Sequence, residues 1–569
     1  MRPTAAVALV VAAAACGPRP RPAVTVVELD QGWRFHGTSD TTWLPARVPG
    51  TVHTDLLAAG RIPDPFAGAV EDDLQWIEDE AWTYRLDFDV DPRLLGEDRL
   101  ELVFDGLDTY ADVTLNGRAL LSADNMFRTW RVDARPALGS GTNTLEVRFR
   151  PPVAEGARRA AAHPWPIPHQ EPDVSATRAF SRKAAYQYGW DWGPRYVTSG
   201  IWRPVRLEAW SGARITGAYV TSVTPGPDTV EAVLAVELDV ADAGRVRVGI
   251  RSDDDAFDAV VEDVDMTAPG HVTVRKRLSF AGGELWWPRG AGRGAPRLYD
   301  VSVDVVRGRR WDRRATRVGL RTVALDTTRD AEGSRFRFVV NGTPVFARGA
   351  NVVPLDHFTP RVDSAAYTRL LDDAVASNMN MVRVWGGGVY LPDVFYDLAD
   401  ERGLLVWQDF MFANALVPGD SAFVASVAAE ARDQVRRLRR HPSLALWCGN
   451  NEVAEGWANW GWREEYTADV ARQVDAAYRR VFEDVLPAEV RAGAAEVPYW
   501  PSSPSVGWGH PESLTGGDSH YWGVWWGMEP FRTYARKVPR FASEFGFQAL
   551  PDPATLASFS GDDAGDDTG

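Results

Sequence analysis

Residues 404–452 of the chain read LLVWQDFMFANALVPGDSAFVASVAAEARDQVRRLRRHPSLALWCGNNE. The apolar run at 404–408 predicts a buried strand. Over residues 421–440, apolar side chains recur every three or four positions, which predicts a helix that a proline then ends. A second apolar run of strand length follows at 444–448. Strands joined through a helix in this way indicate a parallel sheet.

The same alternation continues on both sides of this stretch. It predicts strands and helices in turn at residues 345–349, 364–377, 381–385 and 392–402, then strands near Tyr499, near Ser519 and at 540–543. Units at this spacing favour a (β/α)8 TIM barrel. We therefore predict an incomplete barrel over residues 326–560, because the short stretch after Glu544 has no room for an eighth unit. The acidic, glycine-rich end at 561–569 predicts a disordered tail.

The first half of the chain has the pattern of β structure. Apolar and polar residues alternate at 84–90 and at 144–149, which predicts a jelly-roll-like β-sandwich over residues 24–210. Strand-like runs such as 230–240 continue over residues 211–325, a length that suits an immunoglobulin-like sandwich. The predicted fold class is thus a multidomain β and α/β protein.

The N-terminal residues 1–16 have the features of an export signal. Arg2 precedes an apolar run at 5–15 that is too short to span a bilayer as a helix. The run Ala13-Ala14-Ala15-Cys16 resembles a bacterial lipoprotein signal, in which this cysteine would be lipidated; ordinary cleavage is the alternative. We therefore expect an exported bacterial protein that is periplasmic, extracellular or anchored to the membrane through Cys16.

Composition narrows the class of ligand. The formal net charge of −16 argues against nucleic acid as a partner, because phosphate binding needs basic patches. The chain has 24 tryptophans, whose flat faces suit sugar rings, although core packing explains most single tryptophans equally well. We expect no cofactor and no metal site.

The carboxyl ends of the predicted barrel strands carry a short set of polar side chains. In a barrel of this type the catalytic groups lie at those ends. They include Arg383, Trp385, Asp409, Asn450, Asn451, Glu452, Asp518, His520 and Glu544. Two carboxylates on separate strands suit a general acid and a nucleophile at a glycosidic bond, whereas one such Glu alone would be read as a helix cap or a solvated charge. If Arg383 reaches Glu544, it should keep that group ionised and leave Glu452 protonated.

Several motifs support a family resemblance. They are YGWDWGP at 188–194, VRVWGGG at 382–388, WQDF at 407–410, WCGNNE at 447–452 and SEFGFQ at 543–548. With them the chain resembles the β-mannosidases of glycoside hydrolase family 2 over nearly all its length after the signal, in the same domain order. The resemblance implies that the first sandwich is galactose-binding-like and that the barrel is catalytic.

The resemblance also implies an activity: hydrolysis of terminal, non-reducing β-D-mannose by a retaining, exo-acting β-D-mannosidase through double displacement. Glu452 would be the acid/base and Glu544 the nucleophile. The substrate-binding residues would be Trp190, Asp191, Arg383, Trp385, Asn451, His520 and Trp522. In the family the residue at Asn451 binds the 2-hydroxyl and the one at Asp191 the far hydroxyls. The partners would be β-mannoside oligosaccharides or glycoprotein glycans.

Two alternatives stay open. The first is another family 2 β-glycosidase, such as a β-galactosidase. The glucuronidase branch is disfavoured because it needs an Asn-x-Lys element, which none of Lys183, Lys276 and Lys537 provides. The second alternative is a carbohydrate-binding lipoprotein whose incomplete barrel has lost catalysis.

Overall fold

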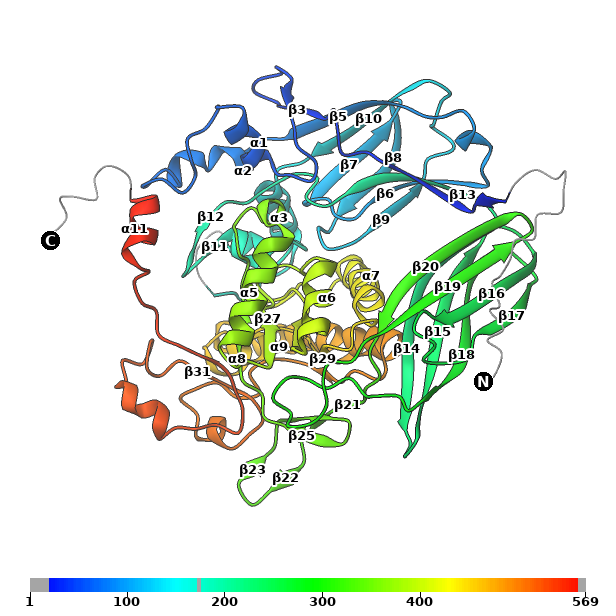
Figure 1. The fold of residues 1–569 in the computed structure, drawn as a ribbon. Helices are drawn as coiled ribbons and strands as arrows, with labels where there is room; N and C mark the ends of the chain where they lie inside the picture. The colour runs from blue at the N-terminus through cyan, green and yellow to red at the C-terminus, as the bar shows by residue number, and fades with distance from the viewer. Residues whose placement is uncertain (1–19, 171–174, 561–569) are drawn as a thin grey trace.

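The computed structural model describes residues 20–170 and 175–560. The predicted signal with Cys16 and the predicted tail at 561–569 lie outside the described residues. Two β-rich bodies, at the top and the right of Figure 1, flank a central body of strands and helices. None of the described helices is long and apolar enough to cross a membrane.

The first β-rich body is a sandwich of two antiparallel sheets, with strand orders β4-β3-β5-β10-β7-β8 and β2-β13-β6-β9. The bounds are β2 Val24–Glu28, β3 Arg34–Gly37, β4 Leu44–Pro45, β5 Trp82–Asp89, β6 Arg99–Phe104, β7 Tyr110–Leu115, β8 Arg118–Asp124, β9 Trp130–Asp133, β10 Thr142–Phe149 and β13 Val205–Trp210. Tyr84 and Val147 from one sheet pack in the same core as Leu102 and Leu207 from the other. The alternating pattern at 84–90 therefore does place one face of β5 in a core.

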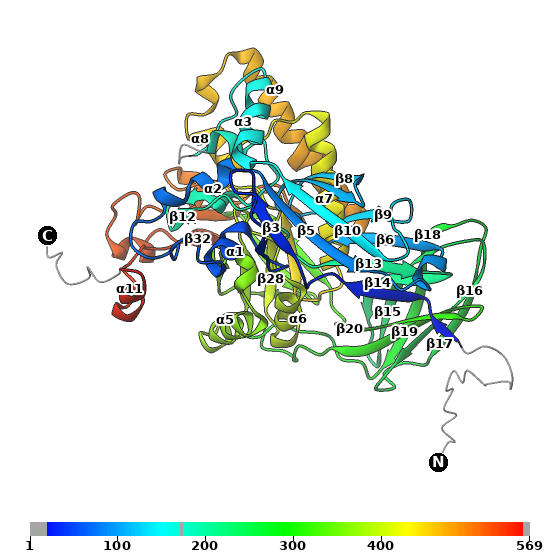
Figure 2. The same cartoon turned by 90° about the horizontal axis from the view of Figure 1, so that it is seen from above.

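Short helices are attached to this sandwich: α1 Val52–Ala58, α2 Trp76–Asp79, α3 Pro152–Ala162 and α4 Ser175–Arg178. The second body has sheets β14-β15-β18 and β1-β20-β19-β16-β17. Their bounds are β1 Arg21–Pro22, β14 Ala213–Pro225, β15 Thr229–Val240, β16 Gly244–Ser252, β17 Val260–Met266, β18 Gly270–Ala281, β19 Tyr299–Arg307 and β20 Arg310–Val318. Figure 2 shows the two sandwiches joined end to end, with β13 running toward β14.

Small β elements connect the second sandwich to the central body. They are the sheet β21-β24-β25 and the hairpin β22-β23, with bounds β21 Val323–Asp326, β22 Arg329–Asp330, β23 Gly333–Ser334, β24 Arg337–Val340 and β25 Thr343–Val345. Asn341 and Gly342 turn β24 into β25 with φ values of 50° and 74°. These left-handed conformations suit Asn and Gly in a two-residue hairpin.

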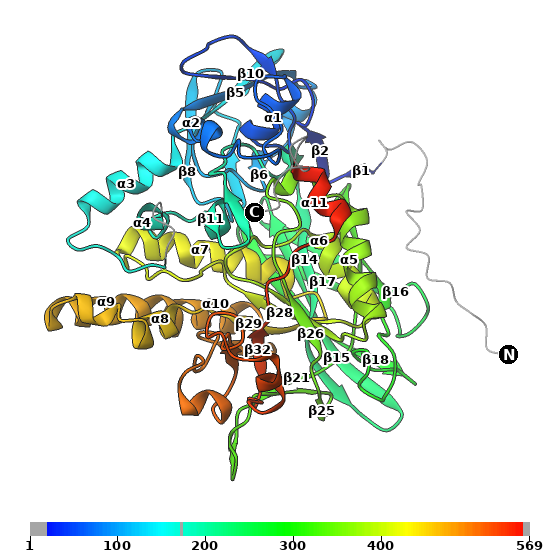
Figure 3. The same cartoon turned by 90° about the vertical axis from the view of Figure 1, so that its left-hand side faces the viewer.

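The central body contains a five-stranded parallel sheet in the order β26-β27-β28-β29-β30. The bounds are β26 Gly349–Val352, β27 Met381–Val384, β28 Leu405–Asp409, β29 Leu444–Cys448 and β30 Tyr499–Trp500. The helices are α5 Ser364–Ala376, α6 Asp393–Arg402, α7 Ser421–Leu438, α8 Val453–Asn459, α9 Ala468–Arg479, α10 Leu486–Gly493 and α11 Pro553–Phe559. Figure 3 shows α7, α9 and α10 along one side of this sheet. Every residue of β28 and β29 is buried, as in a parallel sheet covered on both faces.

The strand–helix–strand unit predicted from residues 404–452 is present as β28, α7 and β29. The first predicted strand, at 345–349, is wrong by several residues. Residues up to Val345 pair with β24 as the second arm of a hairpin, and Phe346 is 82% exposed. Parallel pairing with β27 begins only at Gly349.

The last two strands form a separate parallel pair, β31 Ser519–Tyr521 with β32 Ala542–Phe545. Among the described residues, no ladder of hydrogen bonds joins β30 to β31. The strand pairing thus establishes a multidomain β-rich protein with a parallel α/β sheet, but not the predicted barrel. The hydrogen-bonded sheet ends at β30, which is only two residues long.

A buried ion pair fixes the first sandwich to the central body. Arg182 donates to both carboxylate oxygens of Glu430 on α7, at 2.8 and 2.7 Å. Asn125 and Tyr390 donate to the same carboxylate, each at 2.9 Å. A buried, bidentate pair with further donors is rigid and specific in geometry. It holds the segment around Arg182 against α7.

Candidate active site

A cavity of about 590 Å³ lies where the central strands end. Tryptophans supply much of its wall and polar side chains its floor. The lining residues are Gln170, Trp190, Asp191, Trp192, Asn351, Val353, Trp385, Asn414, Asn451, Glu452, Glu455, Trp460, Gly507, Trp508, His520, Trp522, Trp526 and Glu544. This mixture of apolar walls and a few convergent polar groups is typical of a small-molecule site.

Glu452 enters the cavity from a strained backbone. It precedes α8 with φ 59° and ψ 8°, in the left-handed backbone region that residues other than Gly rarely adopt. Its N–H donates to Ser503 O at 2.7 Å, which holds this conformation. Its carboxylate accepts hydrogen bonds from Asn414 Nδ2 at 2.8 Å and from His520 Nδ1 at 2.7 Å. Strain that is maintained in this way is common at functional sites.

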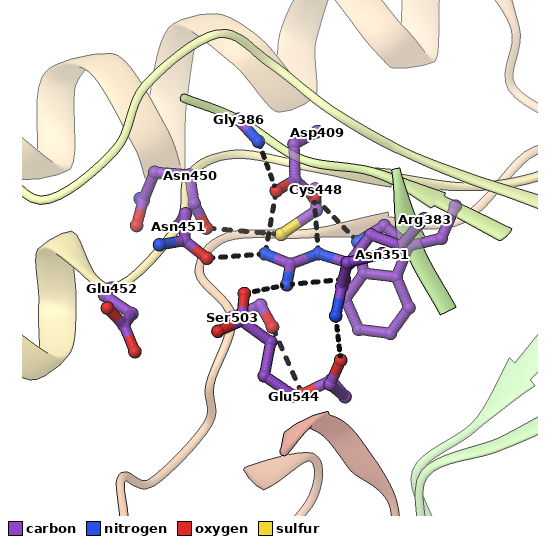
Figure 4. Close-up of polar contacts among 12 residues, drawn as sticks. Asn351, Arg383, Gly386, Asp409, Cys448, Asn450, Asn451, Glu452, Ser503 and Glu544 are labelled. Carbon is purple, nitrogen blue, oxygen red and sulfur yellow. Dashed lines mark hydrogen bonds and ion pairs between the residues drawn. The ribbon is translucent and has the colours of Figure 1, made fainter. Parts of the chain in front are cut away.

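Glu544 enters from β32 and meets Arg383 of β27. Arg383 Nη1 donates to Glu544 Oε1 at 2.5 Å, and its Nη2 donates at 2.8 Å to both Asp409 and Asn451. Figure 4 shows this guanidinium between the three groups. Trp522 Nε1 donates to the other Glu544 oxygen at 3.3 Å. The predicted contact between Arg383 and Glu544 is therefore present.

His520 lies between the two carboxylates. Its Nδ1 is 2.7 Å from a Glu452 oxygen and 3.3 Å from a Glu544 oxygen, and one oxygen of each carboxylate lies within 4.8 Å of the other. On the far side of the ring, Nε2 is 2.9 Å from Ser503 Oγ, which donates to Asp518 Oδ2 at 2.6 Å. Asp518 and His520 are both buried. The ring is thus fixed at both nitrogens.

The protonation predicted for Glu452 is wrong for the free site, because the pKa of this carboxylate is lowered. Burial would raise the pKa of Glu452, but the hydrogen bond and charge of His520 lower it overall. Burial and the nearby Glu452 carboxylate raise the pKa of Glu544, against His520 and Arg383. Burial opposes protonation of His520, yet the two carboxylates raise its pKa above 6.5. The imidazole between the carboxylates, for which the sequence predicted only substrate binding, is therefore the group at which the site favours protonation.

Glu452, His520 and Glu544 also have the spacing of a metal-binding group. Arg383 already compensates the Glu544 charge at 2.5 Å, and a cation beside a fixed guanidinium is electrostatically disfavoured. The geometry thus favours proton transfer over metal binding at these three residues.

A hairpin from the first sandwich closes one wall of the cavity. It consists of β11 Tyr188–Trp190 and β12 Gly193–Arg195. The Trp190 ring meets the Trp385 ring edge-on, with centroids 4.8 Å apart. Burial raises the pKa of Asp191 at the hairpin tip, and the charge of Glu452 adds to this effect. Asp191 and Glu452 are therefore close enough to interact electrostatically.

All the predicted substrate-binding residues except Arg383 line the cavity, as do both predicted catalytic carboxylates. Arg383 is buried beneath them. Sequence reasoning missed Asn414, which bonds to both Asn451 and Glu452, and it missed Ser503. Asn414 lies in the loop after β28, so its position beyond a strand end was an available signal. No comparable signal marks Ser503.

Comparison with protein families gives two matches. Residues 33–203 match the glycosyl hydrolase 2 galactose-binding domain-like model, and residues 213–321 match the glycosyl hydrolases family 2 model. Among curated proteins, β-mannosidase B of Thermothelomyces thermophilus is 36% identical over 94% of this chain and 63% of its own length. β-Mannosidase B of Aspergillus fumigatus is 34% identical over 93% and 63%.

Among solved structures, the β-D-mannosidase of Dictyoglomus thermophilum has a TM-score of 0.87 and 38% identity, covering 94% of this chain and 65% of that one. The exo-chitosanase of Amycolatopsis orientalis shares the fold, with a TM-score of 0.65, 19% identity, and 94% and 60% coverage. This chain spans less than two thirds of the length of these relatives.

Proposed function

Because this chain belongs to glycosyl hydrolase family 2, we propose that it is a retaining, exo-acting β-D-mannosidase. Its substrates would be β-mannoside oligosaccharides or glycoprotein glycans. The observation that carries the proposal is the pair of carboxylates, Glu452 and Glu544, facing one tryptophan-lined cavity with oxygens within 4.8 Å of each other. A separation of roughly 5 Å supports retention, because inverting enzymes need extra room for a water molecule.

In the proposed mechanism, Glu544 attacks the anomeric carbon while Glu452 gives its proton to the leaving oxygen. The glycosidic bond breaks and a covalent mannosyl–enzyme ester forms. Glu452 then takes a proton from water, whose oxygen attacks the anomeric carbon and releases Glu544. The proton that Glu452 needs at the start lies 2.7 Å away, on His520 Nδ1. Transfer to Glu452 leaves the imidazole neutral and Glu544 free to act as an anion.

The walls of the cavity support exo action on mannose. The hairpin carrying Trp190 and Asp191 closes one side, so a chain end would fit where a continuing chain would not. Asn451 is 2% exposed, and Arg383 and Asn414 fix its amide from either side. We propose that this fixed amide binds the 2-hydroxyl, which is axial in mannose, and that Asp191 binds the far hydroxyls.

Two further parts of the proposal concern the fold and the cell. We propose that β26–β30 and the β31–β32 pair are parts of one (β/α)8 barrel, because both groups of strands direct residues into the same cavity. We also propose export through the segment at 1–16, with lipidation at Cys16 or cleavage as its two outcomes.

A panel of p-nitrophenyl β-glycosides tests the proposal. We expect kcat/KM for the β-mannoside to exceed that for the β-galactoside and the β-glucoside by at least about a hundredfold, since a misplaced hydroxyl leaves fixed polar groups unpaired. Faster cleavage of the galactoside would overturn the mannoside assignment. Binding of mannose in calorimetry without any hydrolysis would favour a sugar-binding protein instead.

The pH dependence tests the role of His520. Because its raised pKa keeps a proton in the site, the alkaline limb of kcat/KM should lie above pH 6.5 for a mannoside with a poor leaving group. His520→Gln removes this proton store, so the limb should move to lower pH. The matched control is 2,4-dinitrophenyl mannoside, whose leaving group needs no proton and whose alkaline limb should move little. An unchanged limb on the poor substrate would contradict the role.

A further inference from the structure

A second, strongly charged cavity of about 710 Å³ lies where both sandwiches meet α7. Eight arginines and five carboxylates line it, in a chain whose net charge is −16. The arginines are Arg131, Arg203, Arg206, Arg214, Arg314, Arg436, Arg437 and Arg440; the carboxylates are Asp105, Glu237, Asp239, Asp393 and Asp433. The proposed hydrolase mechanism uses none of these residues.

Four of these arginines pair with carboxylates of the two sandwiches. The pairs are Arg131 with Glu208 at 2.6 Å, Arg206 with Asp105 at 2.6 Å, Arg214 with Asp239 at 2.9 Å and Arg436 with Glu237 at 2.9 Å. These ion pairs account for that part of the wall as structural interactions, three of them within a sandwich and one between the second sandwich and α7.

The other four arginines surround one carboxylate, Asp393, at the start of α6. Arg437 pairs with it at 2.6 Å and Arg440 lies 3.6 Å away, with Asp397 as a further partner of Arg440. Among the described residues, no carboxylate lies within 4.0 Å of Arg203 or Arg314, whose hydrogen bonds go to backbone carbonyls. Positive charge therefore exceeds negative charge on this side of the cavity.

These guanidinium groups also repel one another. Burial, together with the charge of the neighbouring Arg437, lowers the pKa of Arg203 to about 10. The Nη2 atom of Arg437 is buried and has no hydrogen-bond partner among the described residues. Guanidinium groups keep their charge in proteins, so an anion between them would relieve the repulsion and fill an unused donor.

We propose that this cavity binds a phosphate-type oxyanion, held by Arg203, Arg437 and Arg440 with the exposed Arg314 at the rim. Planar guanidinium groups match the oxygens of phosphate with paired hydrogen bonds. Arg203 belongs to the first sandwich, Arg314 to the second, and Arg437 and Arg440 to α7 and the turn after it. The bound anion would therefore tie the three bodies together. The cavity is larger than inorganic phosphate needs, so it also has room for a phosphate that is carried on a sugar. The oxyanion is therefore either free phosphate or a sugar phosphate.

Titration calorimetry on the full chain tests the site, with inorganic phosphate, mannose 6-phosphate and neutral mannose as probes at constant ionic strength. Arg437→Gln should weaken phosphate binding about tenfold, as expected for one lost charge-assisted hydrogen bond. Arg432→Gln is the matched control, because this exposed arginine lies on the same helix, pairs with Glu489 and does not line the cavity. Asp393→Asn should have the opposite effect and tighten binding, since it removes the competing carboxylate.

Equal affinities for the two phosphates would assign a free oxyanion, and tighter binding of mannose 6-phosphate would assign a phosphorylated sugar. Absence of phosphate binding, or equal binding by Arg437→Gln and Arg432→Gln proteins with native circular dichroism, would overturn the proposal. If the Arg437→Gln protein does not fold, the Asp393→Asn protein tests the proposal instead. Phosphate binding by Asp393→Asn that is weaker than, or equal to, that of the parent would contradict the site.

Discussion

Glu544→Ala is expected to reduce kcat on p-nitrophenyl β-mannoside by roughly 10⁵-fold or more, because no covalent intermediate forms without the nucleophile. The substitution also opens space beside the anomeric carbon. Added azide should occupy that space, attack the substrate directly and release α-mannosyl azide, with inverted configuration. The rate with and without azide, and the anomer of the product by NMR, are the measurements.

Glu529→Ala is the matched control for this experiment. Glu529 lies on the segment between β31 and β32, where it bonds with Tyr521 and Lys537 and does not line the cavity. Its loss should leave kcat within a few-fold of the parent. Removing Glu544 leaves Arg383 paired with Asp409, so the variant should still fold. A Glu544→Ala protein with native unfolding behaviour and substantial turnover would contradict the nucleophile assignment.

Glu452→Ala should separate substrates by their leaving groups. General acid assistance contributes about 10²–10⁴-fold, so turnover of unactivated mannosides should fall by that amount. 2,4-Dinitrophenyl mannoside needs little assistance, so its first step should stay fast while the second step slows and KM falls. Azide should speed this variant too, but by attacking the covalent intermediate and giving β-mannosyl azide. Equal losses on both substrates, or the α-anomer, would contradict the acid/base role.

The two azide products give one joint test of retention. Attack on the free substrate inverts the anomeric carbon once, whereas attack on a mannosyl ester of Glu544 inverts it a second time. Only a double displacement with the two roles as assigned yields the α-azide from Glu544→Ala and the β-azide from Glu452→Ala. Exchanged products would mean that the roles of Glu452 and Glu544 are reversed.

Local patterns in the sequence were enough to predict the elements with strong periodicity. The apolar runs of β28 and β29 and the helical spacing of α7 are local features, and the structure has them close to where they were predicted. The start of β26 was misplaced because the residues before it pair with β24, which is a choice between two partners that composition does not reveal. The predicted closure of the barrel depends on pairing between strands far apart in sequence, and the observed ladders do not establish it.

In the site, too, some features were predictable from the sequence and others depended on the fold. Strand ends and family motifs brought Glu452, Glu544 and Arg383 together correctly in space. The predicted protonation failed because it considered only Arg383 and omitted the imidazole 2.7 Å from Glu452. Likewise, the cluster around Asp393 combines arginines from three bodies. The sequence does not reveal such a group, because only the fold brings those side chains together.

The buried pair between Arg182 and Glu430 limits how this protein can be divided into fragments. A minimal fragment that starts at the α/β body would keep Glu430 but lose the guanidinium and the amide of Asn125 that satisfy it. Cutting a buried ion pair in half typically costs about 3–5 kcal/mol, enough to remove much of the stability of an ordinary domain. The same cut would remove Trp190 and Asp191 from the cavity. The first sandwich is therefore not an accessory module that recombination could exchange freely. We expect it to be inherited together with the α/β body as one unit.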